Sequence, residues 1–210
     1  MVRFLPLALL ALTACGSTEP RYLIDSAPAE TSAQVRMQVA TLEVRDVSLP
    51  AYAEDSQILI EGADGALTPL DNALWADEPT RAVTMRLAEA IGRGGSATVA
   101  VEPWPLETPA QAEIHVLVSE MVARASGQFD LKGQFAISSY DHVIRERIKR
   151  FEISVPLSEA TPRGIAQTSG LALQKLAEQI TRELARGGAV DSFPVKRQLH
   201  IDRTPPKTSI

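Results

Sequence analysis

Three segments of alternating apolar residues, followed by one long amphipathic stretch, constrain the fold of this chain more than any other feature. Ile114, Val116 and Val118 share one face of the first segment. The later two repeat the pattern with Phe129, Leu131, Phe135 and Ile137, and then with Phe151, Ile153 and Val155. A period of two is typical of a strand with one buried face. The sequence therefore predicts an antiparallel meander of three strands.

The stretch after this meander has the period of a helix. Thr161 and Pro162 supply its N-cap and first-turn residue, and Gly187 and Gly188 supply its end. Its apolar stripe consists of Leu173, Leu176, Ala177, Ile180 and Leu184. Such a stripe must be buried against another element, and the apolar face of the meander is the obvious partner.

A second helix is predicted beyond Asp71, where the apolar period again becomes helical, with Pro79 at its start and Gly92 near its end. The alternation of Val35, Met37 and Val39 predicts a strand, and further strands are expected at 22–24, 57–61 and 98–101. The predicted class is α+β: a mostly antiparallel β-sheet with two main amphipathic helices packed on one face.

Residues 1–14 indicate a secretory signal peptide, because Arg3 precedes an apolar stretch that is too short to span a bilayer as a helix. The sequence Leu12-Thr13-Ala14-Cys15 then resembles a bacterial lipobox. In such lipoproteins the cysteine sulfur takes a diacylglycerol, the preceding peptide bond is cut, and the new amine is acylated. We expect a mature chain that begins at lipidated Cys15, with residues 15–20 as lipidated N-terminus and linker.

Cys15 is the only cysteine, which excludes an internal disulfide and a multi-cysteine metal cage. Its alternative interpretation is the tail of an ordinary signal peptide or a buried free thiol. Three acyl chains would anchor the protein essentially permanently, because each buried methylene contributes about 0.8 kcal/mol. Gly16 stands where an aspartate would indicate inner-membrane retention in other lipoproteins, so we expect an outer-membrane location facing the periplasm.

The charge balance and the ionisable residues exclude several function classes. A formal net charge of −5 provides no electrostatic footprint for nucleic acid. The histidines at 115, 142 and 200 lack metal-ligand spacing, and no nucleophile elbow or phosphate-binding loop occurs. Gly92-Arg93-Gly94-Gly95 follows a predicted helix, which favours a helix end over a nucleotide site. We therefore expect no enzyme activity, no metal and no cofactor beyond the acyl groups at Cys15.

A locally basic run at residues 145–150 stands out in this acidic chain. On a strand, Arg145, Arg147 and Lys149 would project from one face. A solvated face is the simplest interpretation. The alternative is a docking patch for an acidic protein or for anionic lipid headgroups.

Several short motifs, taken in order, resemble one protein family. They are the lipobox, Tyr22-Leu23-Ile24, Leu49-Pro50-Ala51-Tyr52, the segment from Asp55 to Ile58, Trp75-Ala76-Asp77-Glu78-Pro79 and the C-terminal amphipathic helix. Their order and spacing are similar to those of the ABC-type transport auxiliary lipoproteins, which include the lipoprotein of the paraquat-inducible system. Ser56 departs from the pattern, since the family usually has an arginine there.

The resemblance implies a non-catalytic outer-membrane component of an MCE-type lipid transport system. Its implied partners are a periplasmic MCE-domain protein, which it would dock, and an inner-membrane ABC transporter or permease. Such a role would support envelope integrity. The oligomeric state stays open, a homo-oligomer included.

Leu49, Pro50, Tyr52, Trp75 and Pro79 are predicted partner contacts, because they lie on irregular segments, where binding surfaces tend to be found. Core packing at the sheet edge is the alternative for Tyr52 and Trp75.

The chain divides into a signal peptide at 1–14, the linker, a single domain at 21–188, and a tail at 189–210. We expect the tail to be flexible because it lacks apolar periodicity. The second candidate function is a periplasm-facing carrier of lipid or another small ligand, whose sheet and helices would enclose an apolar pocket.

Overall fold

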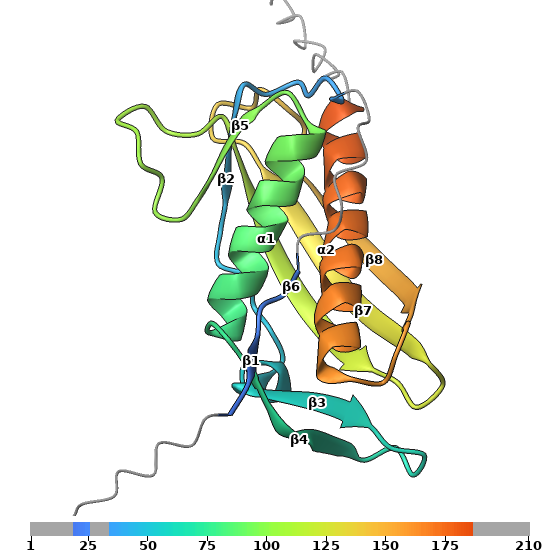
Figure 1. The fold of residues 1–210 in the computed structure, drawn as a ribbon. Coiled ribbons are helices and arrows are strands. Elements are labelled where there is room, and N and C mark those ends of the chain that lie inside the picture. Colours follow the sequence, from blue (N-terminus) through green and yellow to red (C-terminus); the bar gives the residue numbers. More distant parts are fainter. Residues whose placement is uncertain (1–18, 26–33, 187–210) are drawn as a thin grey trace, which may run out of the picture.

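The predicted meander forms the larger part of the sheet. In the structure, a computed structural model that describes residues 19–25 and 34–186, the strands β6 (Ala112–Ala123), β7 (Gln128–Ser138) and β8 (Arg147–Pro156) pair antiparallel in chain order. Their alternating apolar residues are buried on one face, as the period of two requires. Helix α2 (Pro162–Ala185) lies over that face (Figure 1).

Five further strands complete the sheet in the described part of the chain. They are β1 (Arg21–Tyr22), β2 (Thr41–Val44), β3 (Gln57–Glu61), β4 (Leu67–Trp75) and β5 (Thr98–Val101). β3 and β4 form an antiparallel hairpin, whereas β2 lies parallel to both β5 and β6. β3 also pairs parallel with the end of β6, and β1 with β4. The predicted α+β class is confirmed, and the parallel pairings make the sheet a mixed one.

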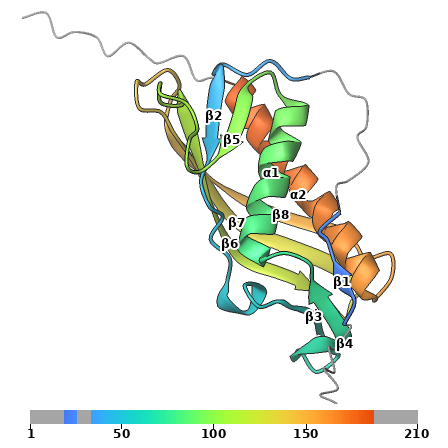
Figure 2. The ribbon, with the colours of Figure 1, turned by 60° about the vertical axis from the view of Figure 1, so that its left-hand side comes forward.

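Both predicted helices pack on the same face of the sheet. α1 (Pro79–Gly94) begins after Glu78, whose carboxylate accepts hydrogen bonds from the backbone N–H groups of Thr80 and Arg81 at 3.1 and 2.8 Å. α1 and α2 lie side by side over the strands (Figures 1 and 2). Their apolar stripes and the inner sheet face form one continuous core.

Two details of the predicted strands are corrected by the structure. The segment 35–39 is not a strand, although Met37 and Val39 are buried as the alternation implied. Its backbone pairs with the end of α1 instead, because Val35 N–H donates to the Gly94 carbonyl at 2.9 Å. The second correction concerns Asp71, where a helical period was expected. β4 continues through Asp71 to Trp75, and the helix starts only at Pro79.

The N-terminal strand enters beside the first turns of α2. Asp25 N–H donates to the Ala166 carbonyl at 3.3 Å, whereas Gln38 N–H donates to the Leu184 carbonyl at 3.2 Å at the other end of the helix. No helix in the described residues is long and apolar enough to cross a membrane. The predicted signal peptide, Cys15 and the C-terminal tail lie outside the described residues.

Candidate functional site

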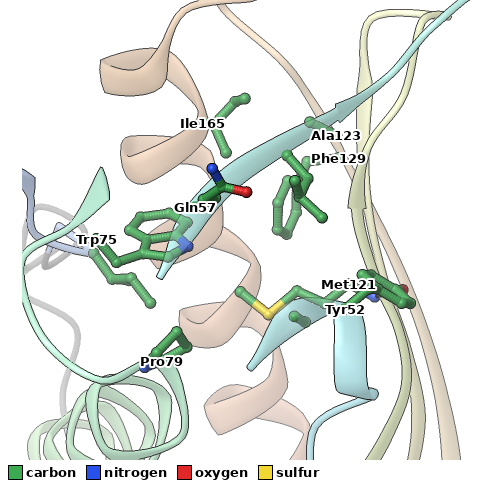
Figure 3. A pocket seen from close by; sticks show the side chains of 11 residues that line it. Tyr52, Gln57, Trp75, Pro79, Met121, Ala123, Phe129 and Ile165 are labelled. Atoms are coloured by element: carbon green, nitrogen blue, oxygen red, sulfur yellow. Dashed lines mark hydrogen bonds between the residues drawn. The ribbon is translucent and has the colours of Figure 1, made fainter. Parts of the chain in front are cut away.

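A small apolar hollow lies between the β3–β4 hairpin, β6 and the start of α2. Trp75 and Pro79 lie on one side of it, with Tyr52 and Phe129 on the other (Figure 3). The remaining lining residues are Ile24, Ala53, Gln57, Leu59, Met121, Ala123 and Ile165. Its volume is about 30 Å³. That space suits one or two water molecules, whereas small-molecule sites usually span about 300–1,000 Å³.

Packing explains most of the apolar residues that were predicted as partner contacts. Leu49 and Trp75 are core residues, only 6% and 9% exposed, and Pro79 is buried as the first residue of α1. Pro50 is half-buried and precedes the short 3₁₀ helix η1 (Ala51–Ala53). Burial agrees with the core alternative for Trp75, and Leu49 and Pro79 are buried as well, so partner contact through these residues stays a prediction.

Tyr52, in the middle of η1, connects this irregular segment to the sheet. Its hydroxyl accepts a hydrogen bond from the Met121 backbone N–H at 3.1 Å. Met121 follows the irregularity between Val118 and Glu120, where the pairing of β6 with β7 changes register. Met121 itself is in register with Leu131 of β7. The Tyr52 hydroxyl therefore adds a tertiary partner for a backbone donor of β6 and ties η1 to this strand.

A cluster of ionic side chains links β3, β6 and β7. The Arg124 guanidinium contacts the carboxylates of Glu61, Glu120 and Asp130. Lys132 contacts Glu120 at 3.0 Å as well as Glu152 at 3.5 Å. Every carboxylate of this cluster therefore has a cationic neighbour.

The ionic cluster alters the proton affinity of its carboxyls. Partial burial would raise the pKa of Glu120, but hydrogen bonds from Arg124 and Lys132 outweigh it and hold the pKa below its usual value. Burial is likewise outweighed at Asp130, whose pKa is lowered by hydrogen bonds from Ser154 and Arg124. Carboxylates held ionised in this way are suited to joining strands, not to donating protons. Within residues 19–25 and 34–186, no group of three or more His, Cys, Asp or Glu residues could hold a metal ion.

The predicted basic patch is rearranged by α2. Arg147 and Lys149 face the helix, where they approach the Glu183 carboxylate at 3.5 and 3.7 Å. Arg145 precedes β8 and does not take part in these contacts. An open cleft of about 310 Å³, here called the basic cleft, lies beside them, lined by Phe135, Lys149, Arg150, Gln179, Arg182, Glu183 and Arg186.

Sequence reasoning missed Arg182 and Arg186 as members of the basic cleft. Their spacing of four residues places them on one side of α2. This spacing was the only feature of the sequence that could have indicated a shared site. The sequence does not show which strand that side of the helix approaches. Only the packed structure brings these arginines to Lys149 and Arg150, more than thirty residues earlier.

The family is decided by comparison with known proteins. Residues 22–181 match the family described as "ABC-type transport auxiliary lipoprotein component". The chain belongs to this family. The matched region runs from the end of β1 into α2 and stops at residue 181, before the last turn of that helix.

Solved structures share the fold of this auxiliary lipoprotein at low sequence identity. Protein XCC0632 from Xanthomonas campestris, of the DUF330 family, is 17% identical and superposes with a TM-score of 0.57, over 78% of this chain and 93% of its own. A crystal structure of an uncharacterized protein is 16% identical with a TM-score of 0.58, over 72% of this chain and 95% of its own. A comparison with curated proteins gave no match.

Proposed function

We propose that the protein is a non-catalytic, lipid-anchored component of an MCE/ABC-type lipid transport system at the outer membrane. In this role it docks a periplasmic MCE-domain protein and so supports envelope integrity. Cys15, carrying an S-diacylglycerol and an N-acyl group, is its anchor. The ABC transporter or permease of the system is the more distant partner.

The family match over residues 22–181 carries this proposal, because it identifies an auxiliary lipoprotein of transport systems. The lipobox at residues 12–15 supports the anchor, and Gly16 supports delivery to the outer membrane. The outer face of the sheet supports a docking role. It presents large apolar side chains to solvent, with Leu117 48% and Ile148 66% exposed.

No observation favours the lipid-carrier alternative. The apolar hollow beside Trp75 has a volume of about 30 Å³, which is far below that of an acyl-chain site. Two larger clefts among the described residues, about 310 and 340 Å³, are open and lined by several charged side chains. Charged walls do not suit an apolar chain.

Membrane fractionation of a Cys15→Ala variant tests the anchor. The wild-type chain should sediment with outer membranes, whereas the variant should lose its acyl groups and its processing by the lipoprotein peptidase. A Gly16→Asp variant is the matched control and should remain lipidated but move to the inner membrane. Acylation of the Cys15→Ala variant would contradict the assignment.

Co-purification in mild detergent with the MCE-domain protein of the same organism tests the docking role. The lipidated wild-type protein should retain that partner, and deletion of the lipoprotein should sensitise cells to detergents. Absence of association, together with an unaltered envelope in the deletion strain, would refute the transport role while leaving the anchor intact.

A further inference from the structure

The basic cleft carries an excess of positive charge that its own carboxylates do not balance. Glu183, with a side chain 16% exposed, is the only carboxylate among the lining residues. It is shared by Arg147, Lys149 and Arg186, at 3.5, 3.7 and 3.2 Å. Because one negative charge serves three cations, the cleft stays electropositive within a chain whose formal net charge is −5.

Two further arginines increase this excess. Arg150 lines the cleft from β8, and Arg182 lines it from α2. The Arg182 guanidinium lies 3.9 Å from the Glu178 carboxylate, which makes a long ion pair, and the Arg182 side chain is 54% exposed. Exposed pairs of this kind contribute little free energy, so the guanidinium is available to a stronger acceptor. Arginine binds carboxylates through two parallel hydrogen bonds, which favours it in anion recognition.

The cleft lies at the opposite end of α2 from β1, which is the first described strand after the lipobox in sequence. Asp25 contacts Ala166 in the first turns of α2, and Glu183 is about 26 Å farther along the helix axis. From Asp25 the described chain runs back through β1, away from the C-terminal end of α2 (Figure 1). The chain between Cys15 and Glu19 spans at most about 15 Å. Anchoring at Cys15 thus holds the β1 end near the bilayer and the basic cleft away from it.

The end of the domain that contains β1 carries the opposite charge to the basic cleft. The segment 51–78, which forms η1, β3 and β4 beside β1, contains seven acidic residues and no lysine or arginine. With the anchor at this end, anionic headgroups attract the basic cleft only weakly, because salt screens charges beyond about 8 Å and the cleft lies about 26 Å farther along α2. The leaflet that holds the anchor is therefore a poor ligand for the basic cleft.

We infer that the basic cleft binds an acidic segment of a periplasmic protein at the membrane-distal end of the domain. The inference rests on the proposed anchor at Cys15, which gives the domain its orientation. The ligand is defined by its chemistry: clustered aspartate or glutamate side chains that accept hydrogen bonds from Arg182, Arg186 and Lys149. The open cleft admits an exposed chain segment and does not require an enclosed pocket.

Fluorescence anisotropy with a labelled poly-glutamate peptide tests the inference on the full lipidated protein in a neutral detergent. The double variant Arg182→Glu/Arg186→Glu should weaken binding at least tenfold. The matched control is Arg163→Glu/Lys175→Glu, which reverses two exposed charges of the same helix outside the cleft and should change binding less than twofold. Binding by the wild type should weaken as salt rises. If circular dichroism shows that the Arg182→Glu/Arg186→Glu variant unfolds, Lys149→Gln on β8 takes its place and should likewise weaken peptide binding.

Vesicle binding tests the competing ligand, an anionic lipid headgroup. Sedimentation of the lipidated protein with phosphatidylcholine and phosphatidylglycerol vesicles should give equal binding for the wild type and the cleft variant. Loss of a phosphatidylglycerol preference in the cleft variant, or equal weakening of peptide binding in both double variants, would overturn the inference. Because peptide binding is measured in detergent, it reports on the cleft even if fractionation refutes the anchor.

Discussion

At the scale of single residues, Arg124 forms three ion pairs that connect parts of the sheet outside the hydrophobic core. It joins Glu120 of β6 and Asp130 of β7, four and six residues away, to Glu61 of β3, which is 63 residues away in sequence. Its side chain is 24% exposed, so its ion pairs are partly shielded from water. Such shielded, hydrogen-bonded pairs contribute more free energy than pairs on an open surface.

The lowered pKa values of Glu120 and Asp130 predict an acid-sensitive contribution to stability. Their pKa values are lower in the folded than in the unfolded chain, so the contribution is present above the ordinary carboxyl values. It is lost as the pH falls through the folded-state values. Replacing Arg124 with glutamine should lower the free energy of unfolding by about 1–2 kcal/mol at pH 7. The loss should shrink below roughly pH 4, where the carboxyls become protonated.

Urea denaturation from pH 7 to pH 3 measures this effect. An Arg93→Gln variant serves as control, since its ion pair with Glu89 lies on the exposed side of α1. The control should parallel the wild type throughout. A pH-independent loss in the Arg124 variant would show that packing, and not charge, explains its role.

At the scale of elements, β6 and β7 approach one another unusually closely at Gly133. A Cβ atom there would lie 2.1 Å from the Leu117 carbonyl oxygen and 2.8 Å from the Phe151 ring. The sheet at this point has no room for any side chain. Gly133, in phase with the apolar residues of β7, is thus required by the contact between strands and not by backbone flexibility.

Gly133→Ala should therefore destabilise the domain by about 1–3 kcal/mol, because both the strand backbone at Leu117 and the Phe151 ring must move. Gly92→Ala in α1 is the matched control. Its Cβ would meet Val99 at an ordinary 3.7 Å, and alanine favours the helix by up to about 1 kcal/mol. The melting temperature and the urea midpoint should both fall for Gly133→Ala and both rise for Gly92→Ala. A neutral Gly133→Ala variant would show that the sheet adjusts at no cost.

At the scale of the whole molecule, the two ends of the domain differ in charge and in their relation to the lipobox. The acidic segment 51–78 lies beside β1, and the basic cleft lies at the far end of α2. In the orientation proposed from the anchor at Cys15, the basic end faces the periplasm. Partners of the transport system would then meet the cleft first.

Site-specific labelling tests this orientation. The thiol of Cys15 is consumed by lipidation in the proposed anchor, so a newly introduced cysteine is the only reactive one. A fluorophore at Arg21→Cys, within about 20 Å of the anchor, should be quenched several-fold more by quencher-bearing lipids than one at Arg186→Cys. Equal quenching at both positions would mean that the domain lies flat on the bilayer.

Much of this molecule follows from local patterns in the sequence. The meander, both helices and the N-cap at Thr161 depend on residues within a few positions of one another, so periodicity and capping chemistry predict them. The family resemblance likewise came from short motifs and is confirmed by the match over residues 22–181. The segment 35–39 shows the limit of this approach. Its alternation predicted the burial of Met37 and Val39 correctly, but Val35 is exposed, and the backbone partner at the end of α1 was not predicted.

Taken alone, the sequence determined the α+β class, the positions of the helices and the candidate lipidation site. Tertiary structure decided that β2 lies between β5 and β6, that Tyr52 reaches Met121, and that α2 brings Arg182 to the cations of β8. The physical reason is the range of the interactions. Periodicity and caps act within one or two turns, whereas strand order and long ionic side chains depend on how distant segments pack around a shared core.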